Sequence, residues 1–283
     1  MTDCNATAPL CSLKNLTGVH SIQLLHKLQD VRRCPCSRLP ERGLVVDGGT
    51  ADDAADAIAW LSALKGWEAV GFEAAPLRCR NAAAKTKRFG SRAALQCKAL
   101  SDKLGTATFT LEAQQQGSLR NTTAGANAVS VETTTLDHEF QHHRRSIFLL
   151  KLDLQGAEVL ALRGAANLLR SQRITYMYVE FDPNLLRESG TSAAEYLALL
   201  HSHGYACHNF RRRYTQPWLC NYKLASGRAD ACWTNLLCAI PSGVQEVDSA
   251  IPTQTWQGVL MRSFCKRQGS HNAIQDCSNI TLS

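Results

Sequence analysis

The chain has 283 residues, of which 45% are hydrophobic and 19% are charged, and it carries a formal net charge of +7. These values are typical of an ordinary globular protein that can bury a sizeable core, as one large domain or as one domain with appendages. No run of eighteen apolar residues occurs, so we expect no transmembrane helix.

The first 42 residues are expected to form a helical extension that contains cysteines. In the stretch GVHSIQLLHKLQDV, apolar residues recur at three-residue spacing, which predicts an amphipathic helix. Pro35 and Pro40 follow it and mark a boundary with the next unit.

Between residues 43 and 241 the pattern alternates between strand and helix. Strands are expected at 44–46, 69–72, 93–99, 106–111, 129–131, 147–152, 174–181, 205–210 and 233–240, with helices at 52–64, from Pro76, at 157–170 and at 192–203. The alternation predicts an α/β fold with a mostly parallel sheet and helices on both faces. The last two strands lack an intervening helix, which allows an antiparallel edge, and 106–111 suits an added edge strand. Residues 242–283 are expected to form an irregular C-terminal tail.

Polar residues and glycines follow several of these strands. In an open α/β sheet, ligands bind beyond the carboxyl ends of the strands. Asp47-Gly48-Gly49-Thr50 ends the first strand, Glu73 ends the second, and Leu100-Ser101 follow the third. The two glycines let backbone approach a ligand, and Glu73 can accept hydrogen bonds from ribose hydroxyls. A nicotinamide oxidoreductase is disfavoured, because no third glycine completes a G-x-G-x-x-G pattern.

Several short motifs resemble those of a known family. The segment DGGTA is similar to the first motif of class I methyltransferases. FkbM-type methyltransferases carry K-x-D-x-E-G-x-E followed by L-x-G-A, and this chain has KLDLQGAE at 151–158 and LRGA at 162–165. Thr135-Leu136-Asp137, Val179-Glu180 and the segment 71–76 (GFEAAP) also match, and the similarity covers about residues 43–240.

The resemblance implies a Rossmann-like class I methyltransferase fold with a seven-stranded sheet, and S-adenosylmethionine as the cofactor. It implies methyl transfer to a hydroxyl, on a sugar-like or other small or glycan acceptor. The residues expected to bind the cofactor are Asp47, Gly48, Gly49, Thr50, Glu73, Leu100 and Ser101.

Three residues are candidates for catalysis. Asp153 ends the strand after the long polar loop and is the first candidate for a general base or a substrate ligand. Glu180 ends the next strand and could lie at the same ligand-binding edge of the sheet as Asp153. Lys151 lies on the same sheet face as Asp153, where it could act in catalysis or only neutralise a carboxylate. We expect no metal site, since no C-x-x-C pair occurs.

Two departures from the family pattern leave an alternative open. Asp53 stands where the first motif has a glycine, and Gln155 replaces the family's common acid. An amide keeps its hydrogen bonding but cannot act as a base. The alternative is a non-catalytic protein that keeps the methyltransferase fold as a binding or scaffold domain.

Two basic clusters, His142-His143-Arg144-Arg145 and Arg211-Arg212-Arg213, are the visible sources of positive charge. They fit either a solvated loop face or a rim that attracts an anionic acceptor. Neither has aromatic residues between its cations, so no nucleic-acid partner is expected. The oligomeric state stays open.

Cysteines and glycosylation sequons bear on the cellular compartment. The chain has twelve cysteines, and N-x-S/T sequons stand at Asn5, Asn15, Asn121 and Asn279. Both features favour an oxidising lumen or the extracellular space. The first residues lack the charged and apolar regions of a signal peptide, which favours the cytoplasm as the alternative.

Overall fold

The computed structural model describes residues 40–110, 128–209 and 234–240. The predicted N-terminal helix, most of the polar loop and the C-terminal tail lie outside these residues, so the predicted domain boundaries stay predictions. All four sequons and the cluster Arg211-Arg212-Arg213 lie outside them as well.

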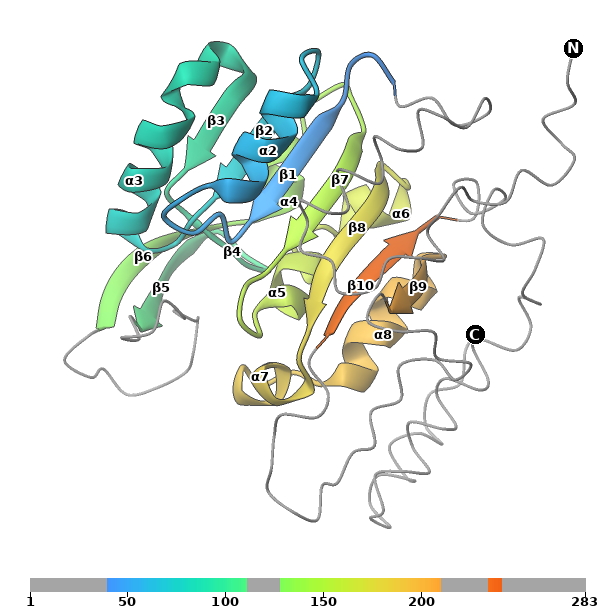
Figure 1. The fold of residues 1–283 in the computed structure, drawn as a ribbon. Coiled ribbons are helices and arrows are strands. Elements are labelled where there is room, and N and C mark those ends of the chain that lie inside the picture. Colours follow the sequence, from blue (N-terminus) through green and yellow to red (C-terminus); the bar gives the residue numbers. More distant parts are fainter. Residues whose placement is uncertain (1–39, 111–127, 210–233, 241–283) are drawn as a thin grey trace, which may run out of the picture.

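The main sheet has seven strands in the order β3-β2-β1-β7-β8-β10-β9 (Figure 1). The strands are β1 (Leu44–Gly48), β2 (Glu68–Phe72), β3 (Ala93–Gln96), β7 (Ile147–Leu152), β8 (Ile174–Phe181), β9 (Ala206–Asn209) and β10 (Thr234–Ala239). All neighbours from β3 to β8 are parallel, and β10 runs antiparallel to both β8 and β9. The predicted mostly parallel sheet with an antiparallel edge is confirmed.

A second, three-stranded sheet corrects two strand predictions. It consists of β4 (Ala99–Leu100), β5 (Gly105–Thr110) and β6 (Ala128–Thr134) in the order β4-β6-β5. The expected edge strand is therefore part of this small sheet, as β5, and not of the main sheet. The predicted strand 93–99 is divided, because Gln96 pairs with the last residue of β2 and the chain then crosses to pair with β6. The small sheet lies beside the carboxyl ends of the main-sheet strands (Figure 1).

The helices are α2 (Ala55–Ala63), α3 (Pro76–Thr86), α4 (Leu136–Phe140), α5 (Glu158–Arg163), α6 (Ala166–Arg170), α7 (Pro183–Glu188) and α8 (Ala193–Ser202), with a 3-10 segment η3 (Lys87–Arg92). The predicted helix 157–170 is split at Gly164, where a Cβ atom would lie 2.1 Å from the carbonyl oxygen of Ser101. Asp137 caps the second piece, since its carboxylate accepts hydrogen bonds from the backbone N–H groups of Asn167 and Leu168. Among the described residues, no helix is long and apolar enough to cross a membrane.

Helices cover both faces of the main sheet because side chains alternate along each strand. Val45 of β1 belongs to the same hydrophobic cluster as Trp60 of α2. Its neighbour Val46 points to the other face, into a cluster with Leu162 of α5 and Leu197 of α8. Because both faces of the sheet are covered, the strands consist of continuous apolar runs, and polar residues stand at the strand ends.

Two disulfides join all four cysteines of the described residues. Cys79 of α3 is bonded to Cys97, between β3 and β4, and Cys207 of β9 is bonded to Cys238 of β10. The second pair links directly opposite residues of two antiparallel strands.

Candidate functional site

A pocket opens where the parallel strands end, and it encloses about 740 Å³ with the solvent at its mouth included. Glu73 from the end of β2 and Asp153 from the end of β7 both line it. The pocket is thus built from the ends of β2 and β7, which flank β1 in the main sheet, and from the small sheet, which contributes Leu100 and Phe109.

The turn after β1 brings the backbone of two strands together. Gly49 has a φ of 81°, and a Cβ atom there would lie 2.0 Å from the carbonyl oxygen of Asp153. Only glycine fits this left-handed, crowded position. The N–H groups of Gly49 and Thr50 donate to the carbonyl oxygen of Phe72, at 2.9 and 3.1 Å. Gly49 lines the pocket, whereas Gly48 and Thr50 do not. The Thr50 hydroxyl instead donates hydrogen bonds to the carbonyl oxygens of Asp47 and Phe72, which stabilise the turn.

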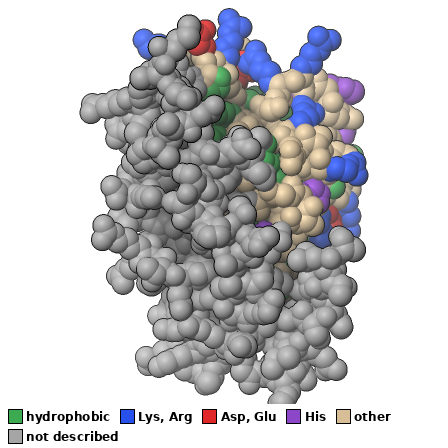
Figure 2. Space-filling view, turned by 90° about the vertical axis from the view of Figure 1, so that its right-hand side faces the viewer, with side chains coloured by type: hydrophobic (Ala, Val, Ile, Leu, Met, Phe, Trp, Pro, Cys, Tyr) green, Lys and Arg blue, Asp and Glu red, His purple; other side chains and the backbone are tan. Residues whose placement is uncertain are grey.

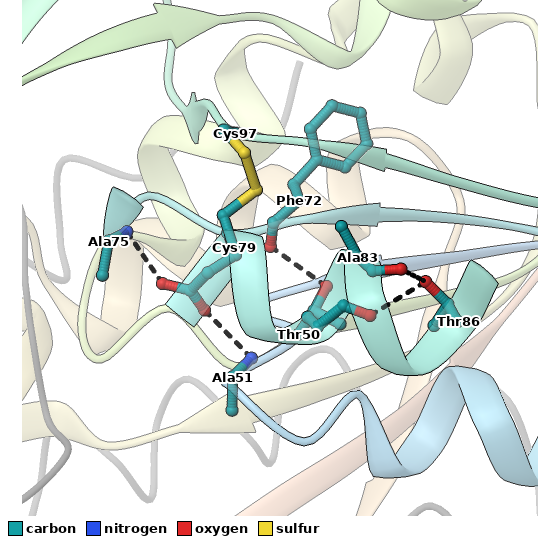
Figure 3. The surroundings of a disulfide bond; sticks show 10 residues. Thr50, Ala51, Phe72, Ala75, Cys79, Ala83, Thr86 and Cys97 are labelled. Carbon is teal, nitrogen blue, oxygen red and sulfur yellow. Dashed lines mark hydrogen bonds between the residues drawn. A yellow bond between two sulfur atoms is a disulfide. The ribbon is translucent and has the colours of Figure 1, made fainter. Parts of the chain in front are cut away.

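The Glu73 carboxylate is buried at the pocket wall, with 6% of the residue exposed. Its oxygens accept hydrogen bonds from the backbone N–H groups of Ala51 and Ala75, each at 2.9 Å (Figure 3). Burial raises the pKa of Glu73, and the two N–H groups and Arg78 oppose that rise. Each carboxylate oxygen keeps a second lone pair for a donor in the pocket.

Apolar side chains form the other part of the wall. Phe72, Ala99, Leu100 and Phe109 line the pocket beside Glu73. Such a surface can hold a flat, apolar ring system, while the carboxylate fixes its orientation. Phe109 was missed by the sequence reasoning, which placed its strand at the edge of the main sheet.

Lys151 and Asp47 lie behind the pocket in a buried ion cluster. Lys151 Nζ is 3.0 Å from Asp47 Oδ1 and 3.4 Å from Asp56 Oδ2, and it donates a hydrogen bond to the carbonyl oxygen of Gly49 at 3.1 Å. Burial lowers the pKa of Lys151, but Asp47, Asp153 and Asp56 raise it by more, so the amine stays charged. Burial raises the pKa of Asp56 to about 6 in spite of Lys151. Lys151 therefore fixes the Gly49 turn from below and does not face the pocket.

Asp153 stands exposed at the mouth of the pocket, and Gln155 joins it to Glu180. The Gln155 amide nitrogen, Nε2, donates to Asp153 Oδ1 at 2.7 Å and to Glu180 Oε2 at 3.0 Å. Gln155 itself lines the pocket, while Glu180 is buried behind it. Asp182, directly after β8, accepts hydrogen bonds from the N–H groups of Asn184 and Leu185 and caps α7.

The structure brings together four of the ten predicted site residues in the pocket wall: Gly49, Glu73, Leu100 and Asp153. It places Asp47, Gly48, Thr50, Ser101, Lys151 and Glu180 outside that wall. Asp53 is also outside it, exposed, with Oδ1 accepting a hydrogen bond from the Ala55 N–H at 3.1 Å.

Two cations line the pocket that no sequence signal indicated, Arg78 of α3 and Lys98 after β3. Lys98 pairs with Glu132 and Glu139, each at 3.2 Å. The disulfide between Cys79 and Cys97 joins their immediate neighbours in the chain and so ties the two sides of this wall together (Figure 3).

A family model for the methyltransferase FkbM domain matches residues 47–207 of the chain. This range starts at the first strand end and includes every residue that lines the pocket. No curated protein matches.

Solved structures that resemble the chain are methyltransferases with little sequence identity. The METTL16 methyltransferase domain gives a TM-score of 0.43 at 11% identity, with 77% of this chain and 66% of that domain covered. The fibrillarin of Aeropyrum pernix, in complex with natively bound S-adenosyl-L-methionine, gives 0.37 at 12% identity, with coverages of 75% and 74%. The human METTL16 catalytic domain in complex with an RNA hairpin from the MAT2A 3′UTR gives 0.41 at 10%, with coverages of 87% and 73%.

The last of these structures corrects the prediction about partners. The expectation that nucleic acid is no partner is contradicted, because that similar domain is bound to RNA. The expectation rested on the lack of aromatic residues within two basic clusters, and one of these lies outside the described residues. In the described part of the face drawn in Figure 2, Lys and Arg side chains stand at several places and form no single patch.

Proposed function

The chain belongs to the FkbM methyltransferase family and has the class I methyltransferase fold, and from this premise we propose that the pocket between Glu73 and Asp153 binds S-adenosylmethionine. The enzyme is an S-adenosylmethionine-dependent methyltransferase. The observation that supports the site assignment is that both carboxylates, from the ends of the two strands that flank β1, open onto one pocket.

The residues of the pocket fit the parts of this cofactor. Glu73 keeps a lone pair on each oxygen and can accept hydrogen bonds from two ribose hydroxyls. Phe72, Leu100 and Phe109 supply apolar surface for the adenine ring. Gly49 lets the β1 turn approach closely, and Asp153 supplies a negative charge for the cationic end of the molecule.

When bound, the cofactor supplies an activated methyl group together with its leaving group, so the protein contributes alignment and proton removal. Asp153 is the candidate to accept the proton that the methylated group loses, since it is exposed at the mouth of the pocket and lines it. Lys151 and Glu180 lie behind the wall and act on the site through Asp47, Gly49 and Gln155.

We propose that the acceptor is a hydroxyl group of a sugar-like molecule. A carboxylate at the mouth suits a hydroxyl, which must lose a proton as it is methylated. A panel of free sugars, sugar phosphates, glycans and RNA oligonucleotides distinguishes the forms in which such a hydroxyl can be presented. Transfer of a labelled methyl group to one of them identifies the class, whereas labelling of amine or thiol acceptors alone would contradict a hydroxyl acceptor.

We propose further that the protein works in the secretory lumen or outside the cell. The disulfides Cys79–Cys97 and Cys207–Cys238 support this, because such bonds persist in oxidising compartments. Thiol titration of protein isolated from its native source tests it, and four free thiols at these positions would argue for the cytoplasm.

Titration calorimetry tests the cofactor site directly. We expect saturable binding of S-adenosylmethionine, and a loss of at least about tenfold in affinity in Glu73→Ala, which removes the acceptor of the ribose hydroxyls. Glu68→Ala is the matched control, because Glu68 lies at the opposite end of the same strand and pairs with Arg145. Absence of binding to the wild type, or equal affinity in both variants, would refute the assignment.

A further inference from the structure

The backbone at residues 155 and 156 has an uncommon conformation beside the pocket. Gln155 has a φ of 53° and Gly156 a φ of 101°, both in the left-handed region. A Cβ atom on Gly156 would lie 2.4 Å from the carbonyl oxygen of Leu185, so the close approach of α7 requires glycine there. At 155 a glutamine holds a conformation that favours glycine, and such strain at a pocket is often kept for function.

The side chain of Gln155 is placed between two carboxylates. One amide nitrogen donates to Asp153 at 2.7 Å and to Glu180 at 3.0 Å, so both of its hydrogens are used. The amide oxygen cannot take this place, because it would face carboxylate oxygens. Glutamine is the longest side chain that offers two neutral donors on one atom, and it reaches both acids from a single position.

We infer that Gln155 is a positioning residue, whose amide holds the Asp153 carboxylate toward the pocket and keeps it apart from that of Glu180. The inference rests on the proposed cofactor pocket and adds to it the residue that orients its exposed carboxylate. An acid at position 155 would instead place a third carboxylate within reach of those of Asp153 and Glu180, and like charges so close disfavour ionisation.

Other titratable groups also interact electrostatically with Asp153, and they are the same in every variant compared below. They are Lys151 on β7, Asp56 on α2, Glu158 on α5 and Tyr178 on β8. Because these groups are unchanged in the variants, the difference between a variant and the wild type isolates position 155.

The first test uses Gln155→Glu and measures the thermal unfolding midpoint of the full chain without ligand, from about pH 5 to pH 8. Gln172→Glu is the matched control, since Gln172 is exposed and has a similar left-handed φ of 51°, in the turn before β8. The carboxyl group introduced by Gln155→Glu binds a proton more tightly in the folded than in the unfolded chain, so folding is weakened as pH rises.

We expect the midpoint of Gln155→Glu to fall below that of the wild type by about 2–4 °C more at pH 8 than at pH 5, and the control to show no such trend. Adding Asp153→Asn or Glu180→Gln to Gln155→Glu should remove most of this pH-dependent loss, because each takes away one neighbouring charge. Equal pH profiles for Gln155→Glu and Gln172→Glu would overturn the inference.

The second test measures the orientation of Asp153 through ligand preference. S-Adenosylmethionine carries a positive sulfonium and S-adenosylhomocysteine a neutral thioether, so a carboxylate in the pocket favours the former. Gln155→Gly removes the amide without adding charge and suits the left-handed backbone. We expect it to reduce the ratio of the two affinities several-fold, in the same direction as Asp153→Asn, with little change for S-adenosylhomocysteine. An unchanged ratio in Gln155→Gly would overturn the inference, whereas a wild type that binds neither ligand would overturn the proposed function instead.

Discussion

Two carboxylates in one pocket have different surroundings and therefore different chemistry. Glu73 is almost fully buried and accepts two backbone hydrogen bonds, which hold it in place as a fixed acceptor. Asp153 is exposed at the mouth and has an amide as its partner, so it is free to meet a second substrate. We therefore propose a binding role for Glu73 and proton transfer for Asp153.

Replacing Asp153 by asparagine separates these roles. The amide is isosteric but cannot accept a proton, so we expect methyl transfer to fall by roughly 10²- to 10⁴-fold. Affinity for S-adenosylhomocysteine should change by no more than about threefold, because Glu73 and the apolar wall are intact. Radiolabel transfer and calorimetry measure the two effects, and a variant with wild-type turnover would show that Asp153 takes no proton.

At the scale of secondary-structure elements, the buried ion cluster joins β1, β7 and α2 under the pocket. Lys151→Met leaves Asp47 buried without its cation, and removing one partner of a buried pair costs about 3–5 kcal/mol of unfolding free energy. Glu68→Gln breaks the exposed pair with Arg145 and should cost less than about 1 kcal/mol. Urea denaturation measures both, and similar costs would mean that Lys151 does not support the turn.

The two disulfides provide a matched pair for the wall of the pocket. The two cysteines of Cys79–Cys97 are 18 residues apart in sequence, and those of Cys207–Cys238 are 31 apart. Removing either bond should therefore lower the free energy of unfolding by about 3 kcal/mol or slightly more. Only Cys79→Ser/Cys97→Ser should also weaken cofactor binding, because it frees the segments that carry Arg78 and Lys98. A comparable loss of affinity in Cys207→Ser/Cys238→Ser would indicate general destabilisation.

Elements with a strong local pattern could be predicted from the sequence, and those that depend on distant contacts could not. The strands 147–152 and 174–181 were predicted with their exact bounds, since both are buried apolar runs. The helix expected from residue 52 begins at Ala55, because Ala54 is left-handed with a φ of 50°. The small sheet pairs strands across the segment 111–127, and no local pattern records such a pairing.

The same distinction applies to the candidate site. Strand ends with glycine or acid were visible in the sequence, and three of those residues, Gly49, Glu73 and Asp153, reach the pocket. Whether a side chain at a strand end points into the pocket depends on the neighbouring strand, as Lys151 shows by turning to Asp47 on β1. Gln155 was noticed as a departure from a family pattern, but its link between two carboxylates required coordinates.

For the molecule as a whole, a buried acid should make stability depend on pH. Burial raises the pKa of Glu158 to about 8, against the backbone N–H groups that bind it. An acid with a raised folded pKa binds more protons in the folded chain, so stability is greatest below about pH 4.5 for this group and is lost as pH rises to about 8. Glu158 alone can give a slope of up to about 1.4 kcal/mol per pH unit in this window.

Glu158→Gln keeps an acceptor for the Leu154 N–H and removes the titration. We expect the unfolding free energy of this variant to decline less steeply between about pH 5 and pH 8 than that of the wild type. Glu41→Gln, at an exposed position, serves as the control. A wild-type slope that persists in Glu158→Gln would assign the dependence to other groups, such as Asp56, whose pKa is also raised.

The central claim is that one pocket at the strand ends binds the methyl donor between Glu73 and Asp153. A crystal structure of the full chain with S-adenosylhomocysteine tests it most directly. We predict ribose hydroxyls on the Glu73 carboxylate, the adenine between Phe72, Leu100 and Phe109, and the sulfur end toward Asp153 and Gln155. A ligand bound elsewhere, or a ribose that does not contact Glu73, would contradict the account.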